Sequence, residues 1–154
     1  MTRLIVLLAA ARLGISGAAT DAWGQTSNAP ADRSVQTGQG HRFACTDYTQ
    51  GKVFMVSAEG RVEWDYPAPS ANDLWVLPNG HLLFNTGHGV KEVTRDKQVV
   101  FNYESKSEIY ACQRLTNGNT FIAECNAGRL LEVDPAGKIV KALRLLPEGK
   151  EGGH

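Results

Sequence analysis

The sequence predicts an all-β chain built from repeated antiparallel sheets. Three segments begin alike, with a glycine and a polar residue that lead into an apolar run, and each run ends at a second glycine. The opening glycines are Gly40, Gly80 and Gly118, and the closing glycines are Gly51, Gly89 and Gly128. The offsets between them, 40 and 38 residues in the first set and 38 and 39 in the second, are typical of repeat architectures.

Residues 69–106 are expected to form one complete unit of the repeat. The expected strands are 74–77, 81–85, 90–94 and 99–103. In the first turn, Pro78 favours the second position of a type I turn, and Gly80 suits the left-handed position that follows. Residues 86–89 and the polar tip 95–97 form the next two turns. Four short strands joined by tight turns indicate a single up-and-down sheet.

The same order of strands and turns recurs on either side of this unit. A second complete unit is expected at 107–146, and a partial unit at 41–68. Their expected strands are 109–115, 121–125, 130–133 and 139–145 in the former, and 43–47, 53–56 and 62–66 in the latter. Polar and apolar residues alternate poorly in several strands, as they do in sheets covered on both faces. The period, the strand count and the covered faces together predict an incomplete β-propeller made of four-stranded antiparallel blades.

Three short segments resemble known propeller repeats. The segment 58–64, Ala-Glu-Gly-Arg-Val-Glu-Trp, and the segment 134–140, Asp-Pro-Ala-Gly-Lys-Ile-Val, resemble the D-x-x-G-K-x-x-W signature of PQQ-type propeller repeats. The segment 77–81, Leu-Pro-Asn-Gly-His, resembles blades of bacterial arylsulfotransferase-like propellers. Together the resemblance covers roughly residues 41–146.

This resemblance implies a role for one tryptophan. In PQQ-type repeats the tryptophan wedges between neighbouring blades, and Trp64 stands at that position, with Phe101 and Ala142 at the corresponding places in the other two units. The resemblance implies no catalytic or cofactor-binding residue in this chain. None of the residues that hold the cofactor in quinoprotein dehydrogenases is matched, and no histidine maps onto the one through which arylsulfotransferases transfer sulfate.

The first 24 residues resemble a secretory signal peptide. A short basic start precedes an apolar run at 4–11, and the small residues Ala22 and Gly24 suit cleavage before Gln25, with cleavage after Ala19 as the second choice. The apolar run is too short to span a bilayer. The alternative is a buried N-terminal helix. Export would place the chain in the periplasm or outside the cell.

The two ends of the remaining chain are polar. Residues 25–40 are expected to form a disordered lead-in, and residues 147–154 a linker or a truncated end. Sixteen basic residues offset sixteen acidic ones, and no basic stripe stands out. The charge pattern therefore predicts neither a nucleic-acid partner nor a membrane surface, and no stable membrane span is expected after the signal peptide is removed.

Three cysteines, Cys45, Cys112 and Cys125, follow the predicted signal peptide. If the turn 116–118 joins adjacent strands, Cys112 faces Ile122 and Cys125 points to the opposite face, so these two cysteines cannot form a disulfide. The spacing of the cysteines matches no zinc motif. We expect three buried thiols.

Four residues at turns and strand starts are candidates for ligand binding: Asp73, His88, Glu108 and Asn126. His88 lies in a turn, where propellers carry binding residues, or is a solvated turn residue, which the lack of an evident partner favours. Asp73 and Glu108 precede the first strands of their units. There they could hold a cation together, although solvated strand starts are the simpler interpretation. His81, at the position of Asn119 in the next unit, is expected to be a turn-flanking surface residue.

No catalytic constellation is recognisable in the sequence. Gly-x-Ser-x-Gly and His-Glu-x-x-His are missing, and Gly87-x-Gly89 lacks the context of a phosphate-binding loop. We therefore predict an exported propeller that binds an unidentified protein or small molecule, without a cofactor or metal ion. The alternative is a quinoprotein-like or arylsulfotransferase-like enzyme whose site needs further blades.

The outermost units present apolar faces for which the sequence offers no neighbour. Propellers close with about four to eight blades, and an exposed apolar face marks an assembly surface or an aggregation hazard. We expect either a piece of a longer protein or a unit that closes by self-association.

Overall fold

The computed structural model describes residues 40–147 and Lys150, which belong to one compact unit of the chain. The predicted signal peptide, nearly all of the predicted lead-in and most of the C-terminal end lie outside the described residues. Within the described part the chain forms strands and turns and no helix. Accordingly, no helix among these residues is long and apolar enough to cross a membrane.

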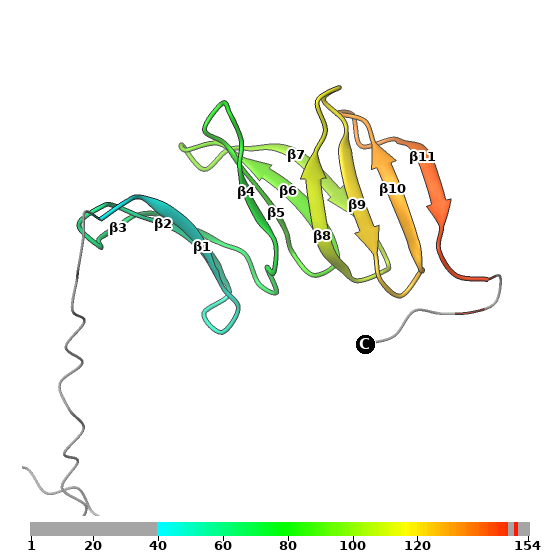
Figure 1. Ribbon diagram of the computed structural model, residues 1–154, viewed down its shortest axis with the longest axis horizontal. Helices are drawn as coiled ribbons and strands as arrows, with labels where there is room; N and C mark the ends of the chain where they lie inside the picture. The colour runs from blue at the N-terminus through cyan, green and yellow to red at the C-terminus, as the bar shows by residue number, and fades with distance from the viewer. Residues whose placement is uncertain (1–39, 148–149, 151–154) are drawn as a thin grey trace, which may run out of the picture. The chain divides into compact units, whose positions relative to one another are not determined.

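The strands form three antiparallel sheets that follow one another in chain order (Figure 1). Blade 1 contains β1 (Phe43–Asp47), β2 (Lys52–Val56) and β3 (Val62–Pro67). Blade 2 contains β4 (Leu74–Val76), β5 (Leu82–Asn85), β6 (Gly89–Val93) and β7 (Val99–Glu104). Blade 3 contains β8 (Ile109–Arg114), β9 (Thr120–Glu124), β10 (Arg129–Val133) and β11 (Ile139–Arg144). Each sheet is up-and-down, as the sequence predicts, because every strand pairs with its neighbour in the chain.

The turns between the first two strands of blades 2 and 3 use the same chemistry. Asn79 and Asn117 each accept a hydrogen bond at 3.0 Å from the backbone N–H two residues later. The intervening Gly80 and Gly118 have φ angles of 83° and 88°, which side-chain-bearing residues rarely adopt. The Asn-Gly pair therefore fixes the direction in which the second strand leaves the turn.

The outer turns of all three blades are also alike. Ser57, Thr94 and Asp134 each accept a hydrogen bond on the side-chain oxygen from the backbone N–H four residues later, at 3.3, 3.1 and 2.9 Å. The residue before that N–H has a positive φ, and it is glycine in blades 1 and 3 but Lys97 in blade 2, at 65°. One glycine of the repeat has thus been replaced by a residue that adopts this conformation less readily.

A register shift precedes each outer turn, between Met55 and Val56 in blade 1 and at the equivalent places in blades 2 and 3. The pairs before the shift are Met55 with Trp64, Glu92 with Phe101 and Glu132 with Lys141. Lys141, and not Ala142, therefore stands at the position of Trp64 in blade 3. The expectation for Ala142 was wrong by one residue, and Ala142 pairs with Leu131 instead.

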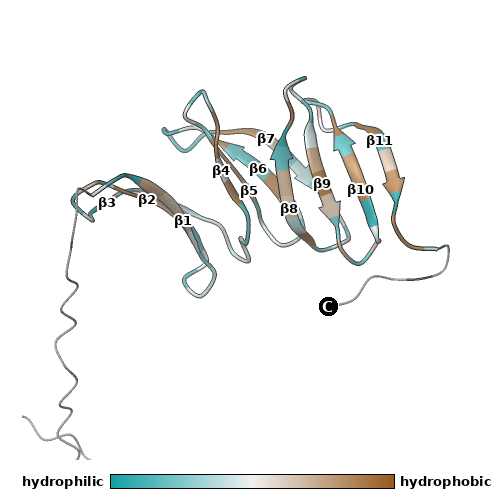
Figure 2. Ribbon diagram, viewed as in Figure 1, coloured by the Kyte–Doolittle hydropathy of each residue, from teal (hydrophilic) through white to brown (hydrophobic). Residues whose placement is uncertain are grey.

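The core lies in the two joints between the blades. Apolar residues recur in the strands of all three sheets (Figure 2). The joint between blades 1 and 2 buries Val53, Met55, Ala68, Ala71, Leu82, Phe84 and Val93. The joint between blades 2 and 3 buries Leu83, Val90, Phe101, Tyr103, Ile109, Cys112, Ile122, Leu131 and Val133. Because β5 and β6 contribute to both lists, the sheet of blade 2 is covered on both faces.

Trp64 occupies the wedge position that the resemblance implies. Its ring packs against the core of the joint between blades 1 and 2, and its Nε1–H donates to the carbonyl of Arg95 at 2.8 Å. The side chain of Lys97 lies over the same ring, 5.9 Å from its centre. Arg95 and Lys97 belong to the outer turn of blade 2, so this tryptophan of blade 1 is held by the next blade.

The outer strand of blade 3 has no such cover. Every residue of β11 is exposed, and Leu143 has an exposed fraction of 58%. Leu143 holds the register position of Tyr103 in blade 2, since each pairs with the corresponding residue of the neighbouring strand. The same position is therefore buried where a blade follows and exposed where none follows among the described residues.

The cysteines differ in part from the expectation. All three are free thiols, and Cys112 pairs with Ile122 across β8 and β9 as predicted. Only Cys112 is buried, while Cys45 and Cys125 are half-buried, so the prediction of three buried thiols was wrong for two of them. Burial, and then the nearby charge of Asp73, raise the pKa of the Cys112 thiol far above its ordinary value, which keeps it protonated and unreactive.

Candidate functional site

Each complete blade has two ends with different contents. Because successive strands run in opposite directions, the first and third turns of a blade lie at one end, which we call the hairpin end. The middle turn and the connection to the next blade lie at the other end, which we call the connection end. Both ends carry polar side chains, and the two groups are described separately below.

The connection end holds a pocket of about 80 Å³. Its lining residues are Tyr48, Ser70, Asn72, Gly87, His88, Glu108, Ile109 and Tyr110. They come from the β1–β2 turn, the connection between blades 1 and 2, the β5–β6 turn, and the start of blade 3. The pocket therefore needs all three blades, and it brings together His88 and Glu108 of the four predicted site residues.

Tyr110 reaches this pocket through an irregularity in β8. The register with β9 changes between Ile109 and Ala111, so Tyr110 is the extra residue of a β-bulge. Bulges redirect side chains and are common beside functional sites. Burial raises the pKa of Tyr110, and the charges of Glu108, Cys125 and Tyr48 raise it further. Glu108 and Tyr48 are thus close enough to act on the phenol electrostatically.

His88 is exposed at the edge of the same pocket. Its backbone is fixed, because its N–H donates to Thr86 O at 3.0 Å and its carbonyl accepts from Ser105 N at 2.8 Å. No hydrogen bond of its imidazole is found within the described residues. His88 also borders a second hollow of about 200 Å³, together with Lys91 and Glu104. A ligand in either hollow can reach the ring.

The other two predicted residues lie elsewhere. The Asp73 carboxylate accepts a hydrogen bond from the backbone N–H of Cys112 at 2.8 Å and one from Trp75 Nε1 at 3.3 Å, which ties blade 3 to blade 2. Asn126 is exposed in the β9–β10 turn and does not line the pocket. Among the described residues, no group of three or more histidine, cysteine or acidic side chains is placed to hold a metal ion.

A buried asparagine that sequence reasoning missed fixes the pocket wall. Asn85 is completely buried, and its Oδ1 accepts from the backbone N–H groups of Asn72 at 2.7 Å and Asp73 at 2.9 Å. Its Nδ2 donates to the carbonyls of Ile109 at 2.6 Å and Ser70 at 3.3 Å. Three of these four partners line the pocket. The one sequence signal was a polar residue at the end of the apolar run 82–84.

A buried carboxylate lies near the same end of blade 3. Glu124, with an exposed fraction of 2%, accepts hydrogen bonds from Ser105 Oγ at 2.6 Å and Tyr103 OH at 3.2 Å, and pairs with Arg129. Burial alone would raise the pKa of Glu124, but the bonds from Arg129, Ser105 and Tyr103 outweigh it, so the pKa lies below its ordinary value. Burial, and then the charge of Glu124, raise the pKa of Tyr103.

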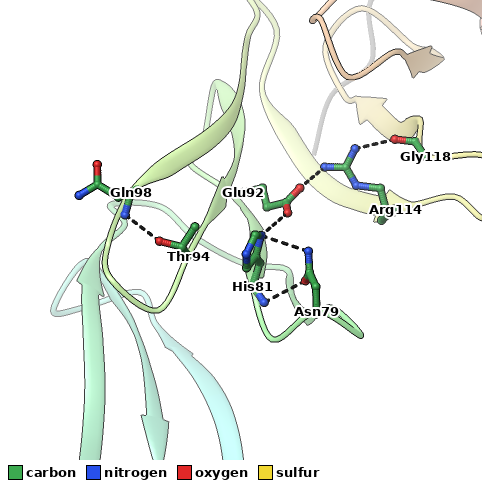
Figure 3. A network of polar contacts seen from close by, with 7 residues as sticks. All are labelled: Asn79, His81, Glu92, Thr94, Gln98, Arg114 and Gly118. Atoms are coloured by element: carbon green, nitrogen blue, oxygen red, sulfur yellow. Dashed lines mark hydrogen bonds and ion pairs between the residues drawn. The ribbon is translucent and has the colours of Figure 1, made fainter.

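The hairpin end of blade 2 holds a network centred on Glu92 (Figure 3). Its Oε1 lies 2.7 Å from His81 Nδ1, and its Oε2 accepts from Arg114 at 2.5 Å. Asn79 Nδ2 lies 3.1 Å from the same His81 nitrogen, and Arg114 also donates to Gly118 O at 2.8 Å. His81 flanks the turn as expected, and its side chain is half-buried, with an exposed fraction of 27%.

Blade 3 repeats this network with asparagine in place of histidine. Asn117 Nδ2 and Asn119 Nδ2 donate to Glu132 Oε1 at 2.9 and 2.7 Å. Glu132 holds the register position of Glu92. Since the arrangement recurs without its histidine, it serves to fasten the hairpin turn to the third strand. A hollow of about 320 Å³ lies beside Glu92 and Arg114, but the two charges there already satisfy one another.

Comparisons with known proteins support the fold and extend no further. No protein-family model matches the chain, and it has no significant match to a curated protein. Solved structures do match. A streptogramin B lyase is 18% identical with a TM-score of 0.59, covering 71% of this chain and 39% of the lyase.

Two more solved structures show the same relation. A catalytically inactive histidine-to-alanine variant of virginiamycin B lyase from Staphylococcus aureus, with quinupristin, is 16% identical with a TM-score of 0.58, covering 72% of this chain and 40% of that one. A protein of unknown function from Bacteroides caccae is 18% identical with a TM-score of 0.51, covering 63% and 40%.

The neighbours are propeller proteins, so the predicted class, an all-β incomplete β-propeller, is confirmed. The chain spans about two fifths of the length of these three structures. At these identities the likeness concerns the fold alone, and fold does not fix function.

Proposed function

We propose that this chain is the binding portion of an exported propeller protein, and that its ligand contacts the pocket at the connection end. One observation supports this above the others. Residues from three blades, including His88, Glu108 and the bulged Tyr110, converge on one pocket. The polar network of the hairpin end, in contrast, recurs from blade to blade as a fastening.

The size of the pocket sets the kind of ligand. Sites for drug-sized molecules and cofactors occupy about 300–1,000 Å³, whereas this pocket measures about 80 Å³. A single functional group fits, and the rest of its molecule would extend into solvent. The pocket is therefore suited to recognising the tip of a larger molecule or partner, and poorly suited to enclosing a ring system such as PQQ.

The test is to locate binding by NMR on the full chain. A set of small amines, carboxylic acids, sugars and aromatic compounds is screened by the ¹H–¹⁵N shifts of residues 87–88 and 108–110. A binding module predicts that at least one compound shifts these amides, and that Tyr110→Ala removes the effect. Phe43→Ala, which truncates an exposed aromatic residue that does not line the pocket, is the matched control. Shifts confined to the hairpin end, around Glu92, would contradict the proposal.

We propose further that the blades are PQQ-type repeats. The side-chain oxygens of Ser57, Thr94 and Asp134 cap equivalent turns, and Trp64 inserts against the next blade. The repeat predicts that a lysine-to-glycine change at Lys97 restores the glycine of the motif and leaves the fold intact.

An enzyme is the second candidate, favoured by the lyases among the structural neighbours. One of these is catalytically inactive as a histidine-to-alanine variant, and His88 stands exposed at the pocket here. Turnover of quinupristin, of a phenolic sulfate donor, or of an alcohol with PQQ and calcium, followed by mass spectrometry, tests this candidate. Turnover that His88→Ala abolishes and His41→Ala spares would favour the enzyme over the binding module.

Export and assembly are also proposed. The signal-like start predicts that exported protein begins at Gln25, which N-terminal sequencing of secreted material tests. The exposed β11 supports either further blades or self-association. A stable, monodisperse monomer in sedimentation, together with a cooperative thermal transition, would contradict both the need for further blades and self-association.

A further inference from the structure

We infer that the connection-end pocket binds an organic ammonium group, an inference that rests on the proposed binding function and names its ligand class. Two tyrosines, Tyr48 and Tyr110, line the pocket together with Glu108. Among the described residues, Glu108 is the one carboxylate that lines it, and no lysine or arginine does. Aromatic rings attract ammonium ions through their negative faces. A carboxylate adds attraction by charge, which is stronger in a partly enclosed site than in open water.

The electrostatics of the pocket agree with this ligand. Burial raises the pKa of Tyr110 most, and the negative charge of Glu108 is the next cause. Burial opposes a charge of either sign, but the Glu108 carboxylate opposes a second negative charge and attracts a positive one at the same place. An anionic or strongly acidic ligand is therefore disfavoured.

The shape of the site agrees as well. The β-bulge that carries Tyr110 lies before Cys112 in β8, and β4 begins only at Leu74, the register equivalent of Cys112. Asn85 holds the backbone of Ser70, Asn72 and Ile109 around the pocket. About 80 Å³ accommodates one ammonium group and its attached carbons, while the rest of the molecule stays outside. Such a group can come from the lysine side chain of a peptide or from a choline head group.

The experiment titrates the full chain with two cations and a neutral control. Nα-acetyllysine methylamide stands for a peptide lysine and choline for a quaternary head group, while 3,3-dimethyl-1-butanol is the uncharged carbon isostere of choline. We expect at least one cation to shift the amides of residues 87–88 and 108–110 and to bind about tenfold or more tightly than the isostere. The tighter of the two cations identifies the source of the ammonium group.

Two sets of variants test separately the contribution of the Glu108 charge and that of the Tyr110 ring to cation binding. Glu108→Gln is expected to weaken cation binding about tenfold, whereas Glu59→Gln, which changes an exposed carboxylate in the β2–β3 turn outside this pocket, leaves it within about twofold. Tyr110→Phe keeps the ring and retains binding within about threefold, while Tyr110→Leu loses about fivefold or more.

Equal binding of the isostere, equal effects of the two glutamate variants, or no shift with either cation would overturn the ammonium inference. If both cations fail while another compound of the screen shifts the same amides, the ligand class is wrong and the binding function stands. If no compound shifts these amides, the ammonium inference and the proposed binding function are both wrong.

Discussion

The joint between blades 1 and 2 and the joint between blades 2 and 3 bury different kinds of side chain. The first is apolar and aromatic, with Trp64, Tyr66 and Phe84 stacked or tilted against one another at 5.8–6.1 Å. The second adds a buried carboxylate, Glu124, and the pair of Glu92 with Arg114. One register position shows the contrast: it is Met55 in blade 1 and Glu92 in blade 2.

Both residues at this position contact an arginine of the following blade. Met55 contacts Arg95, and Glu92 pairs with Arg114. A joint between blades thus accepts either a methionine or a glutamate opposite an arginine of the following blade. The contrast teaches that the repeat unit alone does not decide whether this position is apolar or ionic.

The largest effect is expected in the apolar joint. Phe84 is completely buried and its ring lies 5.8 Å from that of Tyr66. Phe84→Ala should lower the free energy of unfolding by about 3–5 kcal/mol, since it removes a large buried ring and leaves a cavity. Urea unfolding followed by tryptophan fluorescence measures this. A loss below 1 kcal/mol would show that the apolar joint is not the main source of stability.

Glu124 tests the buried carboxylate of the second joint. Glu124→Gln should lower the free energy of unfolding at neutral pH by about 2–3 kcal/mol, because the buried side chain loses its charge-assisted hydrogen bonds from Arg129, Ser105 and Tyr103. Glu104→Gln, on the exposed face of β7, is the matched control and should change stability by less than about 0.5 kcal/mol. Equal effects of the two variants would mean that Glu124 is not held as a charge.

The same carboxylate predicts a pH dependence. The folded pKa of Glu124 lies below the ordinary value of 4.5, so its contribution is complete above that value and is lost as pH falls through the folded pKa. The difference in unfolding free energy between the wild type and Glu124→Gln should therefore shrink as the pH is lowered below 4.5. Urea titrations at several pH values measure it, and a constant difference would contradict the assignment.

Replacing the ion pair of the second joint by apolar side chains is the sharpest test of the comparison. Glu92→Met alone should destabilise by about 2–3 kcal/mol, since Arg114 would lose its partner. Adding Arg114→Leu should recover most of this loss, to within about 1 kcal/mol of the wild type. A double-mutant cycle gives the coupling. Additive losses would show that the two residues act independently.

The smallest effect concerns the bond that Trp64 makes to blade 2. Trp64→Phe keeps an aromatic ring but removes the Nε1–H that donates to Arg95 O at 2.8 Å. A loss of about 1 kcal/mol is expected, measured by thermal unfolding. Trp75→Phe, which removes the weaker 3.3 Å bond to Asp73, should cost less. A larger loss for Trp75→Phe than for Trp64→Phe would show that the hydrogen bond of Trp64 does not stabilise the first joint.

Local chemistry explains what the sequence could predict. The turns follow from residues a few positions apart, such as Asn79 with Gly80 and Asp134 with Gly137. The strands follow from the apolar runs between those turns. The error at Ala142 arose because a register shift near the turn displaces the pairing by one residue.

The contacts between blades could not be predicted from residues that are close together in the sequence. Asp73 meets Cys112 across 39 positions, and Asn85 meets Ile109 across 24. Such partners depend on how one sheet lies on the next, which composition and periodicity do not contain. Of the candidate site, His88 and Glu108 were found because they stand at turns. Tyr110 was not, because a bulge inside a strand carries no clear sequence signal.

The repeated register shift before each outer turn also governs where the chain can change length. Side chains alternate between the faces of a strand, so gaining or losing one residue there would exchange the buried and exposed faces of the following strand. In each blade the outer strand has one residue more than its partner at the register shift. This extra residue sets which side chains of the outer strand are buried, so it must be kept in all three blades. Single-residue insertions and deletions should consequently be rejected within the hairpins 53–65, 90–102 and 130–142.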